Sequence, residues 1–240
     1  MINSVLSKAS LLTFRSGFLL LLLLFCCSIN SELLAQTNTT EPDPARFEQE
    51  IENFAIWDAK NSSPENAVLF VGSSSIRFWN TAEAFPTYPV INRGFGGSHI
   101  SDILYYYERV IGRFDPSLIV FYCGENDIAS GLDQEKVFDD YLTLLSQINQ
   151  SFPDTDFLYV SIKPSSSRLE HTKRFEAFNQ RVKAHNQSSD QLHYIDLGSV
   201  LTGDDDRPDD SLFVSDRLHL NEDGYRLWNE KMREFLSDFW

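Results

Sequence analysis

The sequence predicts a three-layer α/β/α sandwich around a central, mostly five-stranded parallel sheet. Two observations predict this class: short, almost continuously apolar segments recur along the chain, and longer segments with helical periodicity separate them. Strands of a parallel sheet are buried on both faces, so they lack a strict alternation of polar and apolar residues. Right-handed crossovers then place helices on both faces of the sheet.

Ten segments make up this alternating pattern. The expected strands are residues 67–72, 88–92, 117–124, 156–162 and 192–197, and the expected helices are residues 46–60, 99–112, 134–151, 170–188 and 222–238. The apolar side of the first helix is predicted to consist of Phe47, Ile51, Phe54 and Ile56. Ligand sites in open parallel sheets lie at the carboxyl ends of the strands, so those ends are where chemistry is expected.

The first 35 residues are predicted to be a secretory signal peptide. Lys8 and Arg15 provide a basic start, and the apolar run 17–27 follows them. This run is shorter than the roughly 20 apolar residues that a membrane span needs. Cys26 and Cys27 at its end leave a lipid-anchored form open, and an uncleaved anchor is a further alternative. We therefore expect export to the periplasm or the exterior.

Residues 36–45 are interpreted as a polar linker and residues 46–240 as a single domain. After residue 35 the chain has 18 basic and 34 acidic side chains, a net charge near −16. Such a charge repels nucleic acid and anionic lipid headgroups, so nucleic-acid binding is excluded. Cys123 is the only cysteine after residue 35, so no internal disulfide is possible there. Its apolar surroundings predict a buried, structural thiol.

The first predicted strand ends in the sequence Gly72-Ser73-Ser74-Ser75. A serine at a strand-to-helix turn has a hydroxyl exposed above the sheet, and the helix N-terminus favours negative charge that develops there. The alternative interpretation is that these serines only cap the helix.

Two further polar segments follow the next two strands. Residues 92–97 (NRGFGG) contain glycines that let the main chain approach a ligand, although they do not form a dinucleotide-binding motif. In the third segment Asn126 comes directly after a buried strand, where its side-chain amide can point into a site. Both segments are also compatible with ordinary turns.

Near the C-terminus, Asp216 precedes His219 by three residues. A carboxylate at this spacing can fold back onto one ring nitrogen while the other nitrogen faces a serine. The alternative is a surface loop that leads into the last helix, with Asn221 as the helix cap.

Taken together, the four segments resemble in order and spacing the SGNH hydrolases, also called the GDSL family, over about residues 67–237. The resemblance is strongest to the bacterial branch that is similar to the small subunits of platelet-activating-factor acetylhydrolase. It rests on VLFVGSSSIRFW, INRGFGG, YCGENDIASG and DRLHLNEDGY. It implies the flavodoxin-like fold of that family for the domain.

The resemblance also implies a role for each site residue. Ser74 is then the nucleophile, His219 the general base and Asp216 the residue that orients it. The oxyanion hole would consist of the main-chain N–H groups of Ser74 and Gly97 and the side-chain amide of Asn126. No metal or organic cofactor is required.

One position departs from the family pattern, because Ser73 stands where many members carry aspartate. Ser73 and Ser75 therefore remain alternative nucleophiles.

Among other candidates, His99 is expected to start a helix, although it could line the pocket. Residues 163–168 follow the fourth strand and should face the site, as a substrate contact or as a plain turn. The aspartates at 204–206, 209 and 210 lack the spacing of a calcium loop and are interpreted as a solvated loop.

The predicted function is a serine esterase that hydrolyses carboxylic esters of short acyl or acetyl groups. Its substrate would be a small ester, a lipid or an acetylated glycan. Two alternatives stay open: a lysophospholipase-type lipid acylhydrolase, and a non-catalytic envelope or carbohydrate-binding protein on the same fold.

Overall fold

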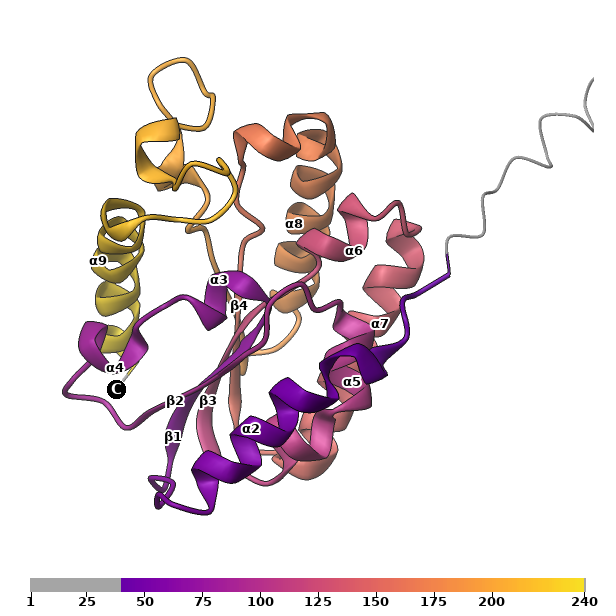
Figure 1. Ribbon diagram of the computed structural model, residues 1–240, viewed down its shortest axis with the longest axis vertical. Helices are drawn as coiled ribbons and strands as arrows, with labels where there is room; N and C mark the ends of the chain where they lie inside the picture. The colour runs from indigo at the N-terminus through magenta and orange to yellow at the C-terminus, as the bar shows by residue number, and fades with distance from the viewer. Residues whose placement is uncertain (1–39, 240) are drawn as a thin grey trace, which may run out of the picture. The chain divides into compact units, whose positions relative to one another are not determined.

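The computed structural model describes residues 40–239 (Figure 1). The predicted signal peptide and residues 36–39 of the predicted linker lie outside these residues. The described chain begins with the short 3-10 helix η1 (Pro44–Phe47), which starts inside the segment interpreted as a linker. Within residues 40–239, no helix combines the length and the apolar character that a membrane span requires.

The five strands form one parallel sheet, as the sequence predicts, and their order is β2-β1-β3-β4-β5. The strands are β1 (Ala67–Gly72), β2 (Val90–Gly94), β3 (Pro116–Tyr122), β4 (Asp156–Val160) and β5 (Leu192–Ile195). The chain moves outward from β1 to β2 and then returns to place β3 on the other side of β1. This reversal is the switch point at which parallel sheets of this type bind ligands.

The register of the sheet brings the ends of three strands level. Gly72, the last residue of β1, lies opposite Gly94 of β2 and Tyr122 of β3. The polar segments that follow these strands therefore start at the same edge of the sheet.

Helices cover both faces of the sheet, which gives the predicted three layers. They are α2 (Glu48–Asp58), α3 (Ser74–Arg77), α4 (Thr81–Ala84), α5 (Ile100–Tyr105), α6 (Glu125–Ala129), α7 (Gln134–Ser151), α8 (Thr172–Asn186) and α9 (Glu222–Phe239). Short connecting turns are the π-helix η2 (Glu108–Gly112) and the 3-10 helices η3 (Ser166–His171), η4 (Ser199–Leu201) and η5 (Asp210–Leu212).

Alternate residues of the strands pack into two separate cores, because successive side chains of a strand point to opposite faces. Leu69 and Val71 of β1 pack with residues of α2, α5, α7 and α8. Val68 and Phe70 pack on the other face with residues of α9, which Figure 1 shows on the opposite side of the sheet from α2. Burial on both faces explains why β1 is apolar throughout.

Some predicted boundaries are wrong. The helix expected over residues 99–112 is broken into α5 and the π-helix η2, and the helix expected from residue 170 begins as α8 at Thr172, after η3.

Phe47, Ile51 and Phe54 are buried as predicted, but Ile56 is 48% exposed. Ile56 lies about 140° around the helix from Ile51, so it misses the buried stripe. Cys123 is buried and free, which confirms its prediction.

Candidate active site

Ser74 begins α3 directly above the carboxyl end of β1. The turn is tight: Gly72 has φ of +145°, and a Cβ added there would come within 1.9 Å of the carbonyl oxygen of Tyr122. Ser73 and Ser75 are buried, with 1% and 2% exposure, whereas Ser74 is partly exposed. The first N–H groups of a helix have no acceptor within it, so the N–H of Ser74 is oriented out of the first turn.

The hydroxyl of Ser74 lies beside an imidazole that is itself paired with a carboxylate. Oγ of Ser74 is 3.0 Å from Nε2 of His219, and Nδ1 of His219 is 2.6 Å from Oδ2 of Asp216. Burial opposes the ionisation of Asp216, but the main-chain N–H and the ring of His219, with the N–H of Leu218, lower its pKa to about 2. The carboxylate is therefore ionised at neutral pH and can accept a hydrogen bond from Nδ1.

A tight loop produces this pairing between residues three positions apart. Oδ1 of Asp216 accepts hydrogen bonds from the main-chain N–H groups of Leu218 and His219, at 2.8 and 2.9 Å. Arg217 between them has φ of +54°, and the N–H of Val214 donates to the carbonyl of His219 at 2.9 Å. The loop thus fixes both the carboxylate and the main chain of the histidine.

The turn after β2 lies between Ser74 and Asn126. A Cβ added to Gly96 would lie 3.8 Å from Cβ of Ser74, and on the other side Nδ2 of Asn126 donates to the carbonyl of Ser98 at 3.1 Å. Gly97, in the middle, has φ of +83°, and no atom lies within 4 Å of the position of a Cβ. The structure therefore brings all five predicted site residues to one edge of the sheet.

Sequence comparison identifies the family of a chain with this arrangement. Residues 75–227 match the profile of the GDSL-like Lipase/Acylhydrolase family. The chain belongs to this family. The matched segment starts one residue after Ser74 and includes the other predicted site residues. A comparison with curated protein sequences finds no match.

Solved structures share the fold of this acylhydrolase family member. A candidate platelet activating factor from Streptococcus pneumonia has a TM-score of 0.71 and 19% identity, over 87% of this chain and 99% of that one. A GDSL-like lipase from Bacteroides thetaiotaomicron has a TM-score of 0.68 and 16% identity, over 79% and 98%. A catalytic mutant of an acetylxylan esterase from Geobacillus stearothermophilus has a TM-score of 0.58 and 11% identity, over 72% and 95%.

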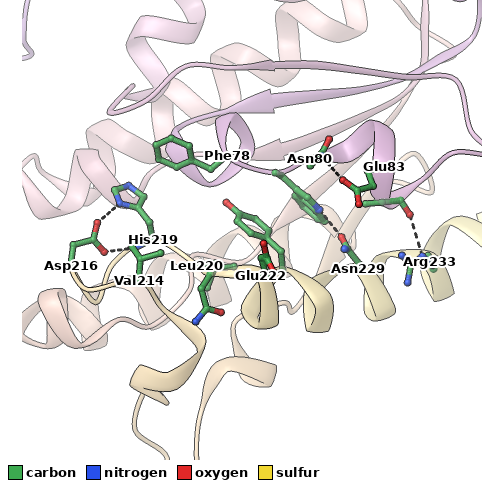
Figure 2. A pocket seen from close by; sticks show the side chains of 14 residues that line it. Phe78, Asn80, Glu83, Val214, Asp216, His219, Leu220, Glu222, Asn229 and Arg233 are labelled. Atoms are coloured by element: carbon green, nitrogen blue, oxygen red, sulfur yellow. Dashed lines mark hydrogen bonds and ion pairs between the residues drawn. The ribbon is translucent and has the colours of Figure 1, made fainter.

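In this GDSL-like chain a cavity of about 890 Å³ opens beside His219 (Figure 2). The exposed ring of Phe78 meets the imidazole edge-on, with 5.1 Å between ring centroids. Polar side chains are common in the rest of the wall, which includes Asn80, Glu83 and Arg233. Figure 2 shows Asp216 and His219 at one end of the labelled side chains and Arg233 at the other.

Two residues that the sequence analysis did not single out hold the segment that carries Ser74. Asn92 in β2 donates from Nδ2 to the carbonyls of Ile76 and Trp79, at 2.8 and 3.0 Å. The hydroxyl of Tyr225 in α9 donates to the carbonyl of Ser75 at 2.9 Å. Asn92 belongs to one of the quoted motifs, so its position at the end of the predicted strand 88–92 is the signal that could have identified it.

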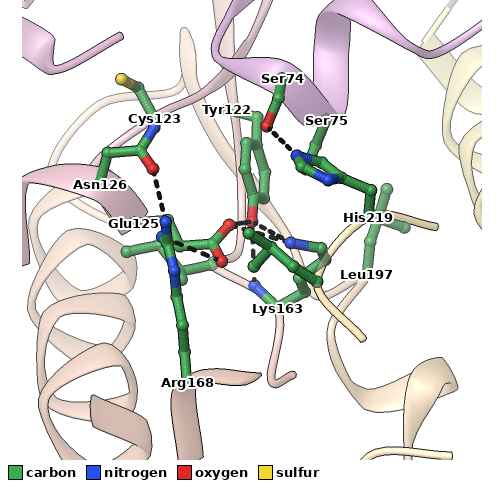
Figure 3. A network of polar contacts seen from close by, with 12 residues as sticks. Ser74, Ser75, Tyr122, Cys123, Glu125, Asn126, Lys163, Arg168, Leu197 and His219 are labelled. Atoms are coloured by element: carbon green, nitrogen blue, oxygen red, sulfur yellow. Dashed lines mark hydrogen bonds and ion pairs between the residues drawn. The ribbon is translucent and has the colours of Figure 1, made fainter. Parts of the chain in front are cut away.

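The remaining candidates have other positions. His99 precedes α5, as the helix-start interpretation predicts, and burial together with Arg46 lowers its pKa to about 4. The side chains of residues 204–206 are exposed in a turn. From the loop 163–168, Lys163 and Arg168 enter a buried polar cluster beneath Asn126 (Figure 3).

Proposed function

We propose that this acylhydrolase family member is a serine esterase in which Ser74, His219 and Asp216 form a catalytic triad. The observation that carries the proposal is the pair of contacts on one imidazole: 3.0 Å to the hydroxyl of Ser74 and 2.6 Å to the carboxylate of Asp216. These distances suit proton transfer from the hydroxyl to Nε2. The burial of Ser73 and Ser75 supports Ser74 over its neighbours as the nucleophile.

The reaction has two steps. Oγ of Ser74 attacks the ester carbonyl carbon, its proton passes to Nε2 of His219, and the carbonyl π electrons move onto the oxygen. The protonated imidazole then gives its proton to the leaving alcohol oxygen as the ester C–O bond breaks, which leaves an acyl-enzyme. Water attacks the acyl group by the same proton path, releases the carboxylic acid and restores the hydroxyl of Ser74.

The negative oxygen of each tetrahedral intermediate needs donors that are already in place. We propose the main-chain N–H groups of Ser74 and Gly97 and Nδ2 of Asn126. The positions of Gly96 beside Ser74 and of Asn126 beside Ser98 support a common site for these three groups. The open space around Gly97 leaves room for the substrate there.

The cavity beside His219 favours a short acyl group over a long alkyl chain. Its wall contains the carboxylates of Glu83 and Glu222 as well as the amides of Asn80 and Asn229. Such groups do not favour a long hydrocarbon chain. The carboxylates of the wall also outnumber its cation, Arg233, so the wall repels the phosphate of a lysophospholipid. We therefore propose acetyl or similarly short esters of polar alcohols as substrates, of which an acetylated glycan is one.

We propose in addition that residues 1–35 direct export, with residues 36–45 as a linker to the domain 46–240. The basic residues Lys8 and Arg15 before an apolar run support this proposal. The N-terminal sequence of the protein recovered from the culture medium or periplasm tests it, since export with cleavage removes these residues.

Ser74→Ala tests the esterase activity directly. The variant should lose at least about 10⁴-fold in turnover of p-nitrophenyl acetate, because no other group can form the acyl-enzyme. Ser73→Ala is the matched control, since it removes a buried neighbouring hydroxyl and should keep the turnover. Unchanged hydrolysis by Ser74→Ala, with an intact circular dichroism spectrum, contradicts the proposal.

A further inference from the structure

The side-chain amide of Asn126 is held from both sides by groups of opposite hydrogen-bonding character. Nδ2 donates to the carbonyl of Ser98 at 3.1 Å, and Oδ1 accepts from Nη2 of Arg168 at 2.9 Å. A carbonyl can only accept and a guanidinium can only donate. Both neighbours therefore select the same orientation of the amide, with its NH₂ group toward the turn that contains Gly97.

The guanidinium of Arg168 is itself anchored in the protein interior (Figure 3). Its Nη1 lies 3.3 Å from Oε1 of Glu125, and Oε2 of Glu125 accepts from Nζ of Lys163 at 2.9 Å and from the hydroxyl of Tyr122. The side chains of Glu125 and Lys163 are 5% and 1% exposed, and that of Arg168 is 20% exposed.

Such burial of charge is costly unless each group is paired. Burial raises the pKa of Glu125, but Lys163 and Arg168 outweigh this effect and lower it overall. Glu125 is thus ionised and holds the guanidinium in place. Two cations surround one carboxylate, so the cluster carries a formal charge of +1 next to Asn126.

We propose that Arg168 is a positioning residue for the oxyanion, acting through the amide of Asn126. The inference rests on the proposed function, since it assumes that Nδ2 of Asn126 donates to the oxyanion. One hydrogen of Nδ2 is taken by Ser98, and the second is left for the substrate oxygen. A cation on Oδ1 polarises the amide, which strengthens the donation from Nδ2.

The effect on catalysis arises because the amide of Asn126 donates to a charge that develops only during the reaction. The charge on the substrate oxygen exists only in the transition state and the tetrahedral intermediate, so a better donor there raises kcat with little effect on KM. A group that only stabilised the fold would not act on kcat through Asn126.

A double-mutant cycle with p-nitrophenyl acetate tests the proposal. Asn126→Ala should lower kcat by about 10²–10³-fold, the usual loss for one oxyanion donor. Arg168→Ala should lower kcat by about 10–100-fold with KM within about twofold, since the amide remains but loses its orientation and polarisation. In the double variant, kcat should lie within about threefold of Asn126→Ala alone, because Arg168 then has no amide to act on. Arg168→Lys, which keeps a cationic donor, should recover part of the loss.

Arg174→Ala is the matched control. Arg174 also fastens the region of α6 that carries Asn126, by donating to the carbonyls of Ile128 and Leu132 at 2.9 and 2.7 Å. It does not bond to the amide. This variant should lower the melting temperature and keep kcat within about twofold of the native value.

The outcomes separate the two proposals. A loss below fivefold for Asn126→Ala removes the oxyanion role on which the inference rests. A large loss for Asn126→Ala with an unchanged kcat for Arg168→Ala overturns the inference and leaves the proposed function intact. Losses that multiply in the double variant also overturn it, because Arg168 would then act independently of Asn126. If Arg168→Ala does not fold, Arg168→Gln, which keeps more of the side chain's bulk, replaces it in the same cycle.

Discussion

The described chain contains two histidine–aspartate pairs with the same contact distance, at opposite ends of the sheet. Nδ1 of His219 lies 2.6 Å from Asp216 and Nε2 of His193 lies 2.6 Å from Asp156, and the histidine side chains are 26% and 28% exposed. Asp156 is the first residue of β4 and His193 the second residue of β5, whereas His219 contacts Ser74 beyond the carboxyl end of β1.

The two pairs differ in what surrounds the rest of the ring. The ring of His219 faces the hydroxyl of Ser74, whereas that of His193 packs edge-on against Phe235 and Phe239, at 5.6 and 5.7 Å between centroids. A histidine–aspartate pair is therefore not a site by itself. A hydroxyl within reach and a position at the carboxyl end of the strands are what distinguish His219 and Asp216.

The largest expected contrast is between the two histidines. His219→Gln should lower kcat by at least about 10⁴-fold, because no other base accepts the serine proton, whereas His193→Gln should stay within about twofold. Steady-state kinetics with p-nitrophenyl acetate measures both. Equal losses in the two variants would show that the contact with Ser74 has no special role.

Substitution of Asp216 and of Asp156 should give the same contrast, with a smaller loss of kcat. Asp216→Asn should lower kcat by about 10²–10⁴-fold, because the amide cannot hold the imidazole in the required tautomer or stabilise its cation. Asp156→Asn removes the same charge from the other pair and should keep kcat within about twofold. A kcat of Asp216→Asn equal to that of the native protein would contradict the orienting role of this carboxylate.

Acid pH should inactivate the enzyme through His219. The protonated imidazole cannot accept the serine proton, so kcat/KM should fall about tenfold per pH unit on the acid side. The pKa values of about 2 for Asp216 and about 4 for His99 keep both out of the range between pH 5 and 7. Burial raises the pKa of Asp127 to about 7, so Asp127→Asn is the necessary control. In this variant and in His193→Gln, kcat/KM should still fall on the acid side. Loss of the acid-side decline in Asp127→Asn would assign the pH dependence to Asp127 and argue against an imidazole base.

The smallest expected effect concerns stability. The pKa of Asp216 falls to about 2 in the folded chain from its usual 3.8, so the native state favours the ionised form. The resulting stabilisation is present above about pH 4 and is lost as the pH falls through about 2. The gap in urea midpoint between the native protein and Asp216→Asn should therefore shrink from pH 5 to pH 2. A constant gap would mean that ionisation of Asp216 does not contribute.

The fold could be predicted because its main signal is local. Residues 67–72 and 118–122 are apolar throughout because both faces of the sheet are covered there, and the helix 134–151 keeps one periodicity from end to end. The errors arise where tertiary packing decides. The break between α5 and the π-helix η2 has no counterpart in the periodicity, and Ile56 was assigned to an apolar side that the packing does not bury.

The candidate site could be predicted only as a set. Ser74, Gly97, Asn126, Asp216 and His219 each lie in a motif with an ordinary alternative, and their order relative to the strands made the combination specific. The anchoring of Asn126 was not predicted. Arg168 and Lys163 lie 42 and 38 residues from the groups they bind, and they meet them only because β3 and β4 are neighbours in the sheet.

The activation of Ser74 by His219 is tested most directly by covalent labelling with a fluorophosphonate, followed by intact mass and peptide mapping. The reagent requires an activated serine and no natural substrate, so it also separates an esterase from a binding protein on the same fold. The native chain and His193→Gln should gain one label, on Ser74, and His219→Gln should react at least about 10³-fold more slowly. A label on another serine, or equal labelling rates with and without His219, would contradict the proposed site.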